Sequence, residues 1–173
     1  MLCSSASLWG CIGIAIDALA ALLTAMAAIA AVYAVRAARD ATRASVIASL
    51  LSAYADPDMG RSLWRLRQWQ DERGQSFASD FRAAREARLP KVLDLDLDRR
   101  RIAHWFQAVH ALATQKFIPM ALTKVVVTPG QASFYLEVIE PMERAISVQY
   151  DDRSFEFFST LQSLPRPAIA TSN

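Results

Sequence analysis

Residues 8–35 read LWGCIGIAIDALAALLTAMAAIAAVYAV, and Asp17 is the one charged residue among them. A helix needs roughly 20 consecutive apolar residues to cross the hydrocarbon core of a bilayer. Residues 18–35 carry no charge at all and nearly reach that length by themselves. We therefore predict that residues 1–35 are a transmembrane anchor whose helix covers about 8–35, with the lipid bilayer as a partner.

A cleaved signal peptide is the alternative for this segment. Such a peptide has basic residues before a short apolar core, whereas no Lys or Arg precedes Arg36 and the apolar run is longer. We therefore favour a retained anchor. Arg36, Arg39 and Arg43 follow the run directly, so the positive-inside rule places them at the inner leaflet, the N-terminus outside and the remainder in the cytoplasm.

Small side chains recur on one face of the predicted anchor, at alternating spacings of four and three residues. Small residues allow two helix backbones to approach closely in lipid, so we predict that this face packs against a second copy of the chain or another membrane protein. In so alanine-rich a segment the same stripe also arises by chance. The helix is expected to continue to about residue 54. The predicted packing face consists of Asp17, Ala21, Thr24, Ala28 and Ala31.

Asp17 has two interpretations. Carboxylates inside a membrane often serve in proton relays or partner ion pairs. This one, however, has no second titratable group in the run, and it is close enough to the end of the helix to reach the headgroups. We favour an interfacial position.

The remainder of the chain has the composition of a charged globular domain. All 19 basic residues and 16 of the 17 acidic residues follow Val35. The resulting small positive charge gives no reason to expect a nucleic-acid partner. We predict one cytoplasmic helical domain over residues 36–164 and a flexible tail over 165–173.

Helical periodicity and helix-end signals predict that this domain is a compact bundle of about five helices, so that the whole chain is all-α. Asp56 and Pro57 are typical of a helix start, and Gly74 of a helix end near Arg73. A short helix is expected between Ser76 and Pro90. The other expected helices cover about 98–116, 120–128 (short and buried), 131–150 (kinked at Pro141) and 153–164.

Three aspartates alternate with leucines in LDLDLDRRR, residues 93–101. An EF-hand loop requires a glycine after its third acidic position and a later glutamate; arginines stand there instead. We expect Asp96 or Asp98 to lie at the N-terminus of the helix over 98–116, where a carboxylate complements the helix dipole.

No metal, cofactor or catalytic site is predicted. His104 and His110 are six residues apart, whereas a metal pair on one helix wants a spacing of three or four, and Cys3 and Cys11 have no companion ligands. The sequence contains no GxSxG, P-loop or GxGxxG motif. Two charged clusters are interpreted as solvated helix faces, with phosphate or headgroup binding as the alternative for the basic one: Arg82, Arg85, Arg88 and Lys91, and Glu137, Glu140 and Glu143.

Several short motifs together resemble a bacterial family of small single-pass membrane-anchored helical proteins with a cytoplasmic domain of unknown function. These motifs are Asp56-Pro57, then Asp98-Arg99-Arg100 followed by Trp105-Phe106, and later Ile139-Glu140-Pro141. The resemblance implies an all-helical fold in a bacterial inner membrane. It implies no activity and no catalytic residues.

Three classes of function remain open. We favour a non-enzymatic, membrane-tethered interaction module, either an accessory subunit or a self-associating scaffold. The alternative is an enzyme or small-ligand sensor with a pocket between helices, lined by Arg99, Arg100 or Glu140. A membrane-active toxin or pore subunit, dependent on Asp17, is the third.

Overall fold

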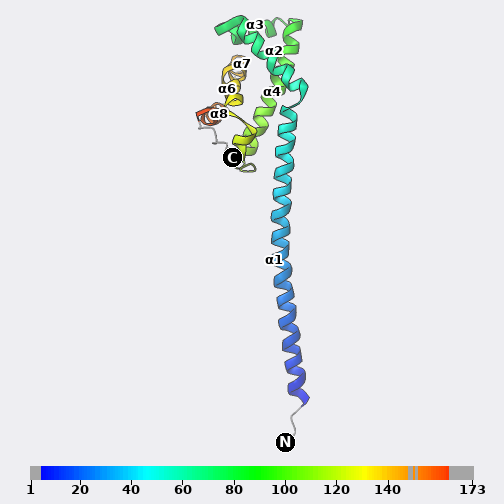
Figure 1. Ribbon diagram of the computed structural model, residues 1–173. Helices are drawn as coiled ribbons and strands as arrows, with labels where there is room; N and C mark the ends of the chain where they lie inside the picture. The colour runs from blue at the N-terminus through cyan, green and yellow to red at the C-terminus, as the bar shows by residue number, and fades with distance from the viewer. Residues whose placement is uncertain (1–4, 148–149, 151, 164–173) are drawn as a thin grey trace, which may run out of the picture. The chain divides into compact units, whose positions relative to one another are not determined.

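The computed structural model describes residues 5–147, 150 and 152–163, with side chains from residue 19 onward. Its regular elements are all helical, and these residues contain no strand, which confirms the all-α prediction (Figure 1). The chain divides into two units, Met1–Ser45 and Val46–Asn173. The second unit therefore begins ten residues after the predicted start of the helical domain at residue 36.

Helix α1 (Ser5–Tyr54) is continuous over 50 residues, as predicted for a helix that continues beyond the anchor. Neither glycine nor proline occurs between Ile14 and Tyr54, and alanine, the best helix former, is abundant there. The most apolar 18-residue window of the described part has a mean hydropathy of 1.9, and none of it is buried. The helix is thus long and apolar enough to span a membrane.

Helix α2 (Pro57–Arg73) begins and ends as predicted. The Asp56 carboxylate accepts a hydrogen bond of 2.7 Å from the backbone N–H of Asp58, and proline occupies the first turn, where its missing N–H is not needed. Gly74 ends the helix with a φ of 56°, a backbone conformation that glycine adopts without strain.

A 3₁₀ turn, η1 (Gly74–Ser76), leads into α3 (Phe77–Glu86). The predicted inward residues of this short helix, Phe77 and Phe81, are buried. Helix α3 packs on both α2 and α4.

Helix α4 (Pro90–Thr114) begins eight residues earlier than predicted. Pro90 is its first residue and not the breaker of the preceding element, because proline suits the first turn of a helix. The prediction that Asp96 or Asp98 lies at the helix N-terminus is therefore wrong. Both are in the body of α4, where arginines neutralise them, and their side chains are buried.

Two short helices follow, α5 (Met120–Val126) and α6 (Pro129–Phe134). The first confirms the short helix expected at this point, but the expectation that it is buried is wrong: Val126 is buried, whereas Val125 on the other side is exposed. The second begins with a capping box, in which Thr128 and Gln131 bond to each other's backbone N–H.

The helix predicted over 131–150 contains a π-helical turn, η2 (Tyr135–Ile139), and then continues as α7 (Glu140–Ile146). Pro141 has no N–H to donate to the carbonyl of Glu137 four residues back. Instead, Gln70 of α2 donates to that carbonyl at 2.9 Å. The irregular turn thereby becomes an attachment point for α2.

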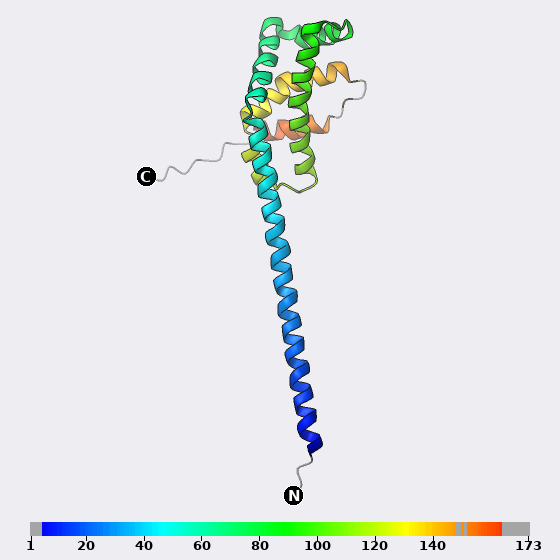
Figure 2. The same cartoon turned by 90° about the vertical axis from the view of Figure 1, so that its right-hand side faces the viewer.

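The last described helix, α8 (Arg153–Ser163), begins at the predicted residue. It lies beside α6, while α2 and α4 lie side by side and α3 packs on α7 (Figure 2). The predicted tail over 165–173 lies outside the described residues.

The core of the second unit is aromatic at its centre. The rings of Phe106, Tyr135 and Phe158 meet pairwise, with centroids 5.0, 5.1 and 4.4 Å apart. The ring of Trp105 lies tilted against that of Tyr54, with centroids 4.7 Å apart, and its indole N–H donates to the carbonyl of Leu50 at 2.9 Å. The last turns of α1 are thus part of this core.

Candidate functional site

The predicted packing face of the anchor lies on α1. The side chains of Ala21, Thr24, Ala28 and Ala31 are exposed, and Thr24 donates its hydroxyl to the carbonyl of Ala20 at 2.8 Å. That bond satisfies the hydroxyl within the helix, so it needs no outside partner. The side chain of Asp17 lies outside the described residues.

The three arginines predicted at the inner leaflet also lie on α1. Arg36 and Arg39 are exposed, and Arg43 is half-buried within ion-pair distance of Asp40, 3.4 Å between Nη1 and Oδ1. An exposed pair at this spacing contributes little stability. Its charges remain available to a surrounding surface.

A buried network of ion pairs surrounds the N-terminal half of α4. Asp96 accepts hydrogen bonds from Arg99 at 2.9 and 2.8 Å, and Arg100 approaches its other oxygen to 2.9 Å. Arg85 of α3 lies 3.4 Å from that same oxygen, and Arg99 also pairs with Glu143 of α7. Asp96 and Arg99 together therefore join α3, α4 and α7.

Asp96 is held in its charged form. Burial alone would raise the pKa of this carboxyl, but the hydrogen bond from Arg99 and the charges of Arg99, Arg100 and Arg85 outweigh it and hold the pKa below its usual range. Because arginines compensate the charge of the buried Asp96 carboxylate, we infer that the network stabilises the packing of α3, α4 and α7.

Asp98 makes the corresponding link from α4 to α2. Its Oδ1 accepts a hydrogen bond of 2.6 Å from the hydroxyl of Ser62, which itself accepts one of 3.0 Å from Arg101. Arg65 lies 3.2 Å from Oδ2, which is buried and has no hydrogen bond. This oxygen is thus stabilised by charge alone.

The expectation that Glu137, Glu140 and Glu143 form a solvated face is wrong for Glu140. This carboxylate is 6 % exposed and accepts a hydrogen bond of 2.7 Å from Arg144. Glu137 remains exposed, and Glu143 is half-buried against Arg99. Fixed arginine partners replace water around two of the three.

The aromatic hydroxyls near α7 are also partly desolvated. Burial raises the pKa of Tyr135, and burial followed by the hydrogen bond with Tyr135 raises the pKa of Tyr150. Their oxygens are 3.5 Å apart. Both groups remain protonated at neutral pH and supply no base.

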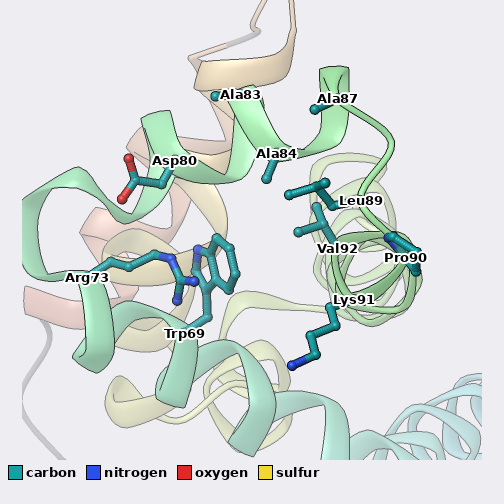
Figure 3. A pocket seen from close by; sticks show the side chains of 10 residues that line it. All are labelled: Trp69, Arg73, Asp80, Ala83, Ala84, Ala87, Leu89, Pro90, Lys91 and Val92. Atoms are coloured by element: carbon teal, nitrogen blue, oxygen red, sulfur yellow. The ribbon is translucent and has the colours of Figure 1, made fainter.

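A groove of about 830 Å³ lies between α2, α3 and the start of α4. It opens to solvent, and Figure 3 shows Trp69 facing Leu89 and Val92 across it, with alanines of α3 along one wall. Its volume is that of a small-molecule cleft. Its lining consists of Trp69, Arg73, Asp80, Ala83, Ala84, Ala87, Leu89, Pro90, Lys91 and Val92.

Trp69 is fixed in the groove by contacts on its edge and its face. Its indole N–H donates to the carbonyl of Phe77 at 3.0 Å, and the Arg73 guanidinium lies 3.2 Å from the ring centroid. Lys91 stands at the opposite rim without an ion-pair partner in the described part of the chain. The groove therefore combines an apolar floor with one free cation at its edge.

The groove does not contain the polar residues predicted to line a ligand pocket. Arg99, Arg100 and Glu140 are engaged in the ion pairs around α4 and α7, and none of the three lines the groove. Within the described residues no three His, Cys, Asp or Glu side chains are placed to hold a metal ion. His110 packs against the rings of Phe157 and Phe158.

Sequence reasoning identified neither the network nor the groove. The network left a signal, because Asp96 precedes Arg99 and Arg100 by three and four residues and Glu140 precedes Arg144 by four, spacings that bring side chains together on a helix. The groove left no comparable signal. Its lining falls within one segment, residues 69–92, but its shape depends on how α2, α3 and α4 pack on one another.

No protein-family model, curated protein or solved structure matches this chain. The geometry alone must therefore support any assignment of function.

Proposed function

We propose that the protein is a non-enzymatic, membrane-tethered interaction module, an accessory subunit or self-associating scaffold. In this proposal α1 spans a bacterial inner membrane with the N-terminus outside, and residues 36–164 form a cytoplasmic helical bundle. The observation that carries it is the exposure of every described side chain from residue 19 to residue 42. In water, so much uncovered apolar surface would drive aggregation, whereas in a bilayer it is solvated.

The second unit supports the tethered arrangement. It has its own buried core, from Met59 to Leu161, and its charged residues are paired across helices. Apart from the last turns of α1, which belong to it, this core does not need α1 to cover it. The apolar segment is therefore free for lipid and for a second helix.

Orientation follows from the arginines. Arg36, Arg39 and Arg43 follow the apolar segment and no Lys or Arg precedes it. Each basic residue near an anionic leaflet is attracted to it by about 1 kcal/mol. That attraction, with the positive-inside rule, favours a cytoplasmic second unit.

Disulfide crosslinking in native membranes tests the partner interaction. In a chain whose Cys3 and Cys11 are replaced by serine, we compare Ala28→Cys on the small face with Met26→Cys, which lies two residues earlier and so about 160° round the helix. Oxidation should give a crosslinked dimer, or a heavier adduct with another protein, for Ala28→Cys alone. Monomer from both variants, or equal crosslinking of both, would argue against packing through this face.

The groove favours a second candidate, a sensor for an apolar small ligand. An apolar cleft with a tryptophan on its floor and a free lysine at its rim suits a ligand with a ring or chain and one negative charge. The probe 1-anilinonaphthalene-8-sulfonate has that chemistry. Its fluorescence should rise with the wild-type chain and not with Ala84→Trp, which fills the groove; equal signals would contradict this candidate.

A further inference from the structure

Helix α5 turns apolar side chains toward solvent. Met120, Leu122 and Val125 are 47, 39 and 59 % exposed, and Ala121 beside them is exposed as well. The opposite side of the helix is buried through Thr123 and Val126. A single helix thus has one face in the core and one apolar face without cover.

Two lysines border this exposed face. The chain contains three lysines, of which Lys116 precedes α5 and Lys124 lies within it. Neither has an ion-pair partner in the described part of the chain. Apolar side chains flanked by lysines are typical of helices that rest in the interface of an anionic membrane, where the apolar groups enter the acyl boundary and the amines stay at the headgroups.

Helix α5 lies at one end of the second unit, next to the end of α4. Within the second unit, both views show α5 (yellow-green) at one end and α3 at the opposite end (Figures 1 and 2). The contact of Trp105 with Leu50 fixes α4 to α1, and α4 then continues to Thr114, next to the loop that leads into α5.

The connection to the apolar segment is short. Residues 36–45 separate that segment from the second unit and are helical. Ten helical residues extend about 15 Å. The second unit therefore begins within about 15 Å, along the chain, of the apolar segment.

We propose that α5 and the preceding loop dock on the anionic leaflet of the same bilayer that anchors the chain. The proposal rests on the proposed function, since it requires α1 to be in the membrane. Lys116 and Lys124 would contact phosphate headgroups, and Leu122 and Val125 the acyl boundary. This second contact would restrain the orientation of the domain on the membrane.

A second exposed apolar strip provides a matched control. Leu93 and Leu97 on α4 are 49 and 63 % exposed. Leu97 is 17 residues before Thr114, which corresponds to about 26 Å along the helix. If exposure alone decided membrane contact, Leu97 would behave as Val125 does.

Site-directed fluorescence quenching in proteoliposomes tests the proposal on the full chain. With Cys3 and Cys11 replaced by serine, we would attach a bimane label to Leu22→Cys, Val125→Cys or Leu97→Cys and use bilayers of phosphatidylglycerol and phosphatidylcholine brominated near the headgroups. We expect quenching at positions 22 and 125 but only the aqueous signal at position 97.

The three positions separate the two proposals. Quenching at 22 with no more at 125 than at 97 would overturn the docking of α5 while the anchor stands. No quenching at 22 would overturn the membrane anchor and α5 docking with it. Adding Lys116→Glu and Lys124→Glu should reduce quenching at 125 by about twofold or more and leave position 22 unchanged. An unchanged signal at 125 would overturn the role of the lysines.

Discussion

Helices α1 and α4, of 50 and 25 residues, are the longest in the described chain and differ in where they place charge. Between residues 19 and 35, α1 has no charged side chain and none that is buried. Helix α4 buries two carboxylates and a guanidinium, Asp96, Asp98 and Arg99. Helix α1 thus exposes its apolar side chains, whereas α4 buries charged ones.

Their surroundings explain the reversal. A buried charge is tolerated only when partners compensate for its lost hydration. α4 receives such partners from α2, α3 and α7. Residues 19–35 have no polar neighbours of that kind, and a lipid environment needs none. The following predictions test this contrast, from the largest expected effect to the smallest.

Arginines placed in α1 should prevent membrane insertion. Leu22→Arg with Ile29→Arg puts two charges into the apolar segment, and each costs about 2.5–3.5 kcal/mol at the centre of a membrane helix. The variant should leave the membrane pellet on alkaline carbonate washing. The matched control is Leu93→Arg with Leu97→Arg on the exposed strip of α4, which should stay in the pellet like the wild type.

Removing the central cation of α4 should destabilise the domain. Arg99→Met leaves Asp96 and Glu143 without their shared partner, and breaking a buried pair in this way costs about 3–5 kcal/mol. Urea unfolding in detergent micelles, followed by tryptophan fluorescence, measures the change. Arg82→Met, which loses only the exposed pair with Glu86, should change stability by less than about 1 kcal/mol. Equal losses of unfolding free energy in the two variants would contradict a stabilising role of the buried network.

The same network should weaken in acid. The pKa of Asp96 is lower in the folded chain than its usual value near 3.9. Its ion pairs therefore contribute full stability above about pH 4, and that contribution disappears as the pH falls through the folded pKa. Asp96→Asn should lower stability at pH 7 and flatten its pH dependence below pH 4. An unchanged acid slope would show that Asp96 is not the group responsible.

A smaller loss is expected where α2 meets the π-helical turn. Gln70→Ala removes the hydrogen bond to the carbonyl of Glu137, to which Pro141 cannot donate, and the loss of one such hydrogen bond costs about 1 kcal/mol. Gln68→Ala, whose amide bonds only to the exposed Glu72, is the control. Thermal unfolding should separate the two variants by a few degrees, and no separation would contradict the attachment of α2 through this carbonyl.

Local signals predicted the helix ends that have local causes. Asp56 with Pro57, and Gly74, act within one turn of the backbone, and α2 has the predicted bounds. Tyr54 as the last residue of α1 also agrees with prediction. These features depend on neighbours in the sequence.

Features that depend on how separate helices pack against one another were not predictable in the same way. The run of aspartates suggested a helix N-terminus at residue 98. That interpretation failed because Asp96 is buried inside the helix and is neutralised partly by an arginine of another element, α3. Glu140 was expected in solvent, but it is buried on α7, which packs against α3. The groove is lined within one segment, residues 69–92, but its shape depends on how α2, α3 and the start of α4 pack, which helical periodicity does not give.

Accessibility labelling of cysteines on the two sides of α1 tests the central claim that it spans the membrane with a cytoplasmic domain. One variant keeps Cys3 alone, with Cys11→Ser, and the other has both replaced and carries Ser79→Cys on the exposed surface of α3. In spheroplasts, a membrane-impermeant maleimide should label Cys3 at once and position 79 only after the membrane is permeabilised. Labelling of both positions, or of position 79 alone, before permeabilisation would contradict the account.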